Sequence, residues 1–85
     1  MGAADADRIA GECERRQVPI LGIEGFHQSG DRIVPAMDFI ADFSSLADLP
    51  WDEQCRRSVE AANEYLLRVK GQPEILFQFI LQVPF

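Results

Sequence analysis

The sequence predicts an α+β domain in which two helices cover one face of a small sheet. Three observations lead to this prediction: two stretches have apolar residues at helical spacing, two apolar runs flank a glycine-containing turn, and apolar residues alternate in the last run. We expect the order α-β-β-α-β and a two-layer sandwich. Its three-stranded sheet would consist of an antiparallel hairpin and a C-terminal strand. With 85 residues, the chain is predicted to form a single domain over residues 1–85.

The first predicted helix covers residues 3–16. It is rich in helix-forming residues, and Arg15 and Arg16 near its end suit the negative end of a helix dipole. Its apolar stripe is narrow, because Ile9 and Cys13 are accompanied only by alanines. This helix is therefore expected to pack at the edge of the domain.

The predicted hairpin spans residues 20–43, with its first strand at residues 20–26 and its second strand in two parts, residues 32–34 and 37–43. The turn at residues 28–31 contains Gly30, which tolerates the positive φ that a tight hairpin connection requires. Pro35 has no N–H to donate to a sheet, so it indicates an edge position or a bulge in the second strand. Simple alternation in the first strand would place Glu24 on the same face as Ile20.

The second predicted helix starts with Asp48 as its capping residue and ends near Lys70. Gly71 and Pro73 follow it, and residues 74–83 form the last predicted strand. The expected core joins one face of this helix to one face of the sheet. The helix would supply Trp51, Cys55, Val59, Ala62 and Leu66, and the sheet would supply Phe39, Phe43, Phe77 and Phe79.

Composition and charge restrict the possible partners. The hydrophobic share of 47% is typical of a globular protein, and the net charge of −6 would oppose binding to nucleic acids or anionic membranes. Cys13 and Cys55 fall on helical apolar stripes, so both are expected to be buried free thiols rather than a disulfide. No apolar run reaches the length of a membrane span, and we expect a cytoplasmic protein.

The sequence contains no recognisable catalytic or cofactor motif. His27 is the only histidine, and no serine or cysteine motif accompanies it. We therefore predict no catalytic residue and no cofactor. The acids Glu24, Asp38 and Asp42 leave open a site for a hard divalent cation. However, Asp38 and Asp42 would lie about 13 Å apart on one strand, which is too far for a single ion.

The second face of the sheet is the predicted binding surface. If both helices cover the face with the phenylalanines, no segment is left to cover the other face, and its apolar side chains would be exposed beside acids. Large exposed apolar patches usually mark interaction sites. The predicted partner-binding residues are Leu21, Ile23, Asp38, Ile40, Asp42 and Ile80.

These features favour a small acidic module that binds another protein with a basic surface. Bacterial immunity proteins and antitoxins, which inhibit basic toxins, are the analogy that size and acidity suggest. One alternative is a homo-oligomeric structural module, for example a homodimer that stacks its open sheet faces. A second alternative is a divalent-metal-dependent enzyme that uses Glu24, Asp38 and Asp42.

Overall fold

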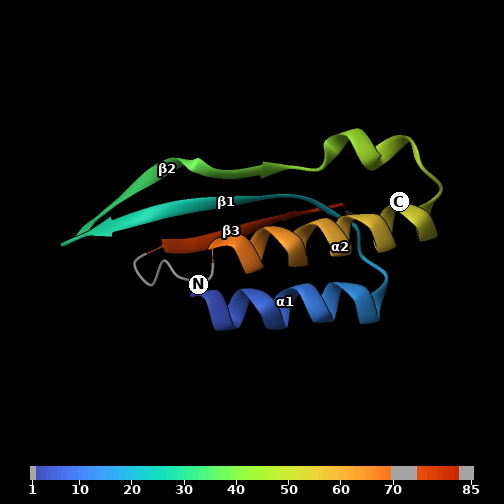
Figure 1. The fold of residues 1–85 in the computed structure, drawn as a ribbon, viewed down its shortest axis with the longest axis horizontal. Coiled ribbons are helices and arrows are strands. Elements are labelled where there is room, and N and C mark those ends of the chain that lie inside the picture. The colour runs from blue at the N-terminus through green and yellow to red at the C-terminus, as the bar shows by residue number, and fades with distance from the viewer. Residues whose placement is uncertain (1, 70–74, 83–85) are drawn as a thin grey trace.

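Three antiparallel strands and two α-helices form the fold (Figure 1). The computed structural model describes residues 2–69 and 75–82, and within them it leaves the side chains of Ala3, Ser29, Met37 and Asp38 undescribed. The strand order is β2-β1-β3, so β1 is central, and both helices lie on the same side of the sheet (Figure 1). The predicted α+β class and the order of helices and strands are confirmed. The elements are α1 (Ala3–Arg16), β1 (Ile20–Ser29), β2 (Arg32–Asp42), the 3-10 helix η1 (Ser44–Asp48), α2 (Trp51–Val69) and β3 (Ile75–Leu81).

Helix α1 has the predicted bounds and ends at a left-handed residue. Gln17 has a φ of 57°, and its N–H points to the carbonyl groups of Cys13 and Glu14. The indole Nε1 of Trp51 donates a hydrogen bond of 2.9 Å to the carbonyl oxygen of Gln17. This bond ties the end of α1 to the start of α2. Trp51 is therefore half-buried at the margin of the core, and not in its centre as the sequence predicted.

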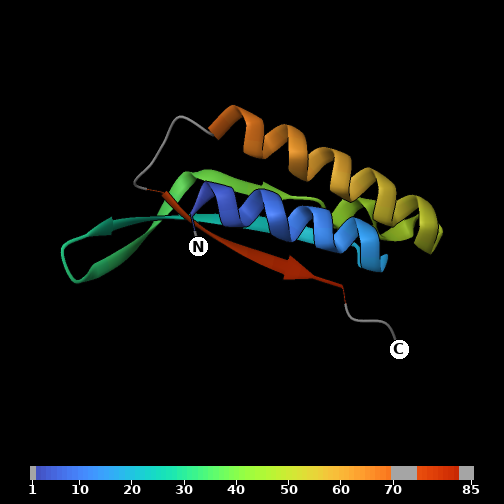
Figure 2. The ribbon, with the colours of Figure 1, turned by 90° about the horizontal axis from the view of Figure 1, so that it is seen from below.

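The β1–β2 hairpin closes through a two-residue loop and extends beyond the helices. Gly30 has a φ of 62°, whereas the φ of Asp31 is not positive, which fits a II′-type turn. Figures 1 and 2 both show the tip of the hairpin projecting past the ends of the helices. Ile33 and Val34 lie in this projecting part and are exposed.

Strand β2 contains a large bulge next to Pro35. Phe26 pairs with Pro35 and Glu24 pairs with Ile40, so residues 36–39 lie opposite Gly25 alone. Because β2 is an edge strand, the missing N–H of Pro35 leaves no gap inside the sheet. The irregularity that the sequence predicted at Pro35 is therefore confirmed.

A second bulge, in β1, changes which residues of this strand face the helices. Ile20 pairs with Leu81 and Gly22 with Ile80, so that Leu21 is the extra residue. Both Ile20 and Ile23 are consequently 0% exposed, although strict alternation places residues three apart on opposite faces. The predicted face assignment of this strand is wrong for this reason.

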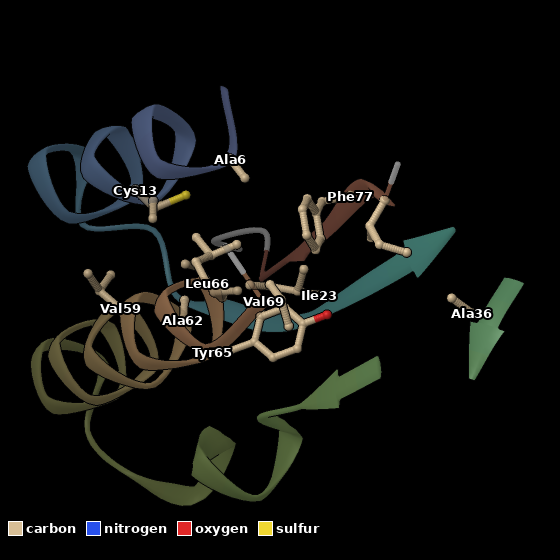
Figure 3. Close-up of a cluster of buried hydrophobic side chains, with 13 residues drawn as sticks. Ala6, Cys13, Ile23, Ala36, Val59, Ala62, Tyr65, Leu66, Val69 and Phe77 are labelled. Atoms are coloured by element: carbon tan, nitrogen blue, oxygen red, sulfur yellow. The ribbon is translucent and has the colours of Figure 1, made fainter. Parts of the chain in front are cut away.

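The core lies between the helices and the inner face of the sheet (Figure 3). Helix α2 contributes the predicted residues Cys55, Val59, Ala62 and Leu66, all of them buried. The predicted capping residue Asp48 is instead the last residue of η1, and α2 begins at Trp51. The predicted helix end at Lys70 lies outside the described residues. From the predicted sheet set, Phe77 is buried, and the half-buried residues that pack against the core are Phe39, Phe43 and Phe79.

Ser58 is a buried polar residue that joins α2 to the start of β1. Its side chain is 0% exposed, and its Oγ accepts a hydrogen bond of 2.9 Å from the Ile20 N–H. The hydroxyl in turn donates to the carbonyl of Cys55 at 3.1 Å. Ser58 therefore satisfies a buried backbone donor next to the bulge at Leu21, where the pairing of β1 with β3 is interrupted.

We expect Ser58→Ala to lower the free energy of unfolding by about 1–3 kcal/mol, because the Ile20 N–H would stay buried without an acceptor. Urea denaturation followed by circular dichroism measures this loss. Ser45→Ala is the matched control, since Ser45 is exposed in η1 and its replacement should change stability by less than about 0.5 kcal/mol. Equal effects of the two substitutions would contradict this role of Ser58.

The two cysteines are buried free thiols, as predicted. Burial raises the pKa of the Cys13 thiol, and it also raises the pKa of the Cys55 thiol. Because only a thiolate is a strong nucleophile, neither group is suited to nucleophilic chemistry near neutral pH. Among the described helices, none is both long and apolar enough to cross a lipid bilayer.

Candidate protein-binding face

The sheet face that points away from the helices is the candidate functional site. Ile23 and Phe77 pack in the core, so their neighbours along β1 and β3 point to the opposite side. Within residues 2–69 and 75–82, both helices lie on the other side of the sheet (Figure 1). We call this surface the open face; it carries Leu21, Glu24, Phe26, Ile40, Asp42, Leu76, Gln78 and Ile80.

A shallow depression of about 350 Å³ lies on one part of the open face. Ile40 and Ile80 lie on opposite sides of β1 and are 43% and 41% exposed. Leu21 and Asp42 also line the depression, so the structure brings four of the six predicted binding residues together. Pairing across the sheet explains this arrangement, because Ile40 pairs with Glu24 and Ile80 with Gly22.

The structure does not place the other two predicted binding residues at the depression. The prediction that Ile23 binds a partner is wrong, because this side chain is fully buried in the core. The bulge at Leu21 is the cause, since it brings Ile23 onto the same face as Ile20. The side chain of Asp38 lies outside the described residues.

Asp42 is the best-defined charge beside the depression. Its Oδ1 accepts a hydrogen bond of 2.9 Å from the N–H of Ser44. Hydrogen bonding from Ser44 holds the pKa of the Asp42 carboxyl below its ordinary value, so this exposed group is ionised at neutral pH. Together with Glu24, it places negative charge beside the apolar side chains.

The acids proposed for a metal site are only partly placed by the structure. Glu24 and Asp42 line the same depression, whereas the side chain of Asp38 lies outside the described residues. Among the side chains that are described, no group of three or more histidines, cysteines and acids is arranged to hold a metal ion. His27 is exposed near the hairpin tip, where its ring makes an edge contact with Phe39 at a centroid distance of 6.1 Å.

Sequence reasoning missed Glu24 and Phe26 as residues of the open face. It placed them with Ile20 because the alternation was carried through the bulge without interruption. Phe26 pairs with Leu76, and both side chains point away from the helices. The signal in the sequence was the spacing of Ile20 and Ile23: two large aliphatic residues three positions apart in one strand share a face only if a bulge separates them.

A second concavity, of about 600 Å³, lies between the end of α1 and the first half of α2. Four of its nine lining residues are acids, but one of them, Glu53, forms ion pairs with Arg56 at 3.7 Å and with Arg57 at 3.1 Å. These contacts belong to a solvated helix surface, and the buried Cys55 thiol at this concavity has the raised pKa described above.

The chain was compared with models of protein families, with curated proteins and with solved structures, and none of the three comparisons found a match. The open face combines the exposed side chains of Ile40 and Ile80 with the carboxylates of Glu24 and Asp42.

Proposed function

We propose that the protein is a small acidic binding module that acts by occupying the surface of a basic partner protein with its open face. One observation carries the proposal: large apolar side chains are exposed beside carboxylates on a sheet face that no described helix covers. Exposed apolar patches with a polar rim mark interaction sites. Leu21, Ile40 and Ile80 would form the apolar centre, and Glu24 and Asp42 would form the rim.

The centre and the rim would have different tasks in such a complex. Removing Ile40 and Ile80 from water would supply affinity, at about 25 cal/mol for each Å² of apolar surface buried. The ionised carboxylate of Asp42 would attract a basic partner during encounter and would disfavour acidic ones. The net charge of −6 extends this attraction over the whole molecule. Binding is therefore expected to weaken as the salt concentration rises.

An inhibitor of a basic toxin, of the type that immunity proteins and antitoxins represent, is the specific form of this function that we propose. Inhibition by occupancy needs a rigid complementary surface and no chemistry on the part of the inhibitor. A sheet provides such a surface, because its backbone hydrogen bonds hold the side chains of neighbouring strands in fixed register. We place this activity in the cytoplasm, since two buried free thiols fit a reducing compartment.

Ile40→Asp tests this proposal, because it puts a charge in the centre of the open face. The tagged wild-type chain should capture a basic protein from a lysate of its source organism, and Ile40→Asp should reduce that binding at least tenfold. The variant should still fold, since Ile40 is 43% exposed.

Leu67→Asp is the matched control. Leu67 is 71% exposed on α2, away from the open face, so its replacement should leave binding unchanged. Circular dichroism checks that both variants are folded. A partner that binds the folded Ile40→Asp variant as tightly as the wild type would refute the proposal, and so would a captured protein that is acidic.

A further inference from the structure

The two edges of the sheet differ in how well they are protected against pairing with another strand. The edge formed by β2 contains Pro35, the bulge at residues 36–39 and the charged residues Arg32 and Asp42. Proline, bulges and charges are the features by which natural sheets prevent edge-to-edge association. Strand β3, at the other edge, has none of them: residues 75–81 contain no charge and no proline, and the extra residue of the second bulge belongs to β1.

Within residues 2–69 and 75–82, no strand pairs with the outer edge of β3. Helix α1 packs against β3, and Figure 2 shows the second half of β3 emerging beyond α1 on the side away from α2. An apolar hollow of about 570 Å³ follows this strand and includes Ile9 of α1 and Phe26 of β1. Within β3, Gln78, Ile80 and Leu81 are exposed. The strand therefore presents apolar side chains from both of its faces next to its outer edge.

We propose that two copies of the chain pair through β3, antiparallel about a two-fold axis at Gln78, and form one continuous six-stranded sheet. This register places Leu76 opposite Ile80 of the second copy, so that apolar side chains meet on the same face of the joined sheet. Gln78 lies opposite itself at the axis. Its amide both donates and accepts hydrogen bonds, which makes it complementary to its own copy.

Charge is the reason for choosing a second copy as the occupant of this edge. Two chains of net charge −6 repel each other, and a self-association surface must therefore exclude acids from its centre. Strand β3 meets this condition, because all seven of its residues are uncharged. The open face does not meet it, because stacking two copies would bring Glu24 and Asp42 of one copy close to those of the other.

Pairing through β3 is compatible with the proposed function and does not depend on it. Ile40 lies on β2, at the opposite edge of the sheet from β3, so it stays outside the new interface. The dimer would present two open faces side by side on one sheet. It would therefore offer a partner two copies of the binding surface.

Charge substitutions at the proposed axis test this inference. The wild-type chain should have twice the 9.6 kDa mass of one chain when light scattering is measured at high micromolar concentration. Gln78→Lys and Gln78→Glu should each reduce the mass to that of one chain, because each puts two like charges opposite each other at the axis. An equimolar mixture of the two variants should restore the mass of a dimer, since lysine then lies opposite glutamate.

Ile40→Lys is the control, and it should leave the dimer intact. Gln78 is exposed, so both axis variants should fold, which circular dichroism verifies. A wild-type chain that is monomeric up to millimolar concentration would refute the proposal. Dimers that survive both Gln78 substitutions, or a mixture that stays monomeric, would exclude an axis at Gln78. A dimer that only Ile40→Lys dissociates would show stacking of the open faces instead.

Discussion

Replacing Ile23 with alanine is expected to lower the free energy of unfolding by about 2–5 kcal/mol. Ile23 is 0% exposed and lies in the core beside the side chains of α2 (Figure 3). The substitution removes apolar contacts and leaves a cavity that the surrounding strands, held by their pairing with β2 and β3, cannot readily close. Urea denaturation followed by circular dichroism measures the loss.

Ile40→Ala is the matched control for Ile23→Ala. The same side chain is shortened in the same sheet, but Ile40 is 43% exposed on the open face. We expect its replacement to cost at most about 1 kcal/mol, because less apolar surface returns to water and no closed cavity forms. If the two substitutions destabilised the protein equally, the assignment of the two faces of the sheet would be wrong.

Gly25→Ala should destabilise the protein by about 3 kcal/mol, at the upper end of what overpacking a core usually costs. A Cβ atom at Gly25 would lie 2.5 Å from the Cβ of Phe39 and 2.9 Å from its carbonyl oxygen. Neither atom is the flexible end of a side chain. The same carbonyl accepts a hydrogen bond from the hydroxyl of Tyr65, so moving Phe39 would also disturb this contact.

In contrast to Gly25→Ala, Gly11→Ala is expected to stabilise the protein. Gly11 lies within α1, and a Cβ atom there would meet nothing within 4 Å. Alanine is the better helix former, so this substitution should raise the free energy of unfolding by about 0.5–1 kcal/mol. Thermal denaturation of both variants compares them directly. A Gly25→Ala protein as stable as Gly11→Ala would contradict the close approach of the bulged β2 strand to β1.

These substitutions separate stability from binding. The inner face of the sheet is expected to respond to small changes in volume, because it packs against the helices. The open face is expected to tolerate Ile40→Asp in the folded monomer while losing its partner. Substitutions at Ile23 therefore report on stability and those at Ile40 on binding, although the two residues lie in neighbouring strands of the same hairpin.

The sequence by itself determined the elements of the fold and part of the candidate site. Helical spacing predicted α1 and most of α2, because Cys55, Val59 and Leu66 repeat on one face of the helix. Gly30 predicted the hairpin turn, since few other residues tolerate its positive φ. Alternation predicted the face of Ile40, because β2 pairs with β1 without interruption from Ile40 to Asp42 and Ala41 packs against the core. In β3 it predicted the face of Ile80, because β3 itself contains no extra residue.

Only the tertiary structure decided which residues of β1 face the helices. The bulge at Leu21 is a property of the pairing between β1 and β3, whose paired residues at this point lie more than fifty positions apart in the sequence. Ser58 depends on the same region, because its role as acceptor exists only where α2 crosses the start of β1. Local propensity acts over a few residues, whereas register is set by contacts between distant segments, and for this reason Ile23 is a core residue and Glu24 belongs to the open face.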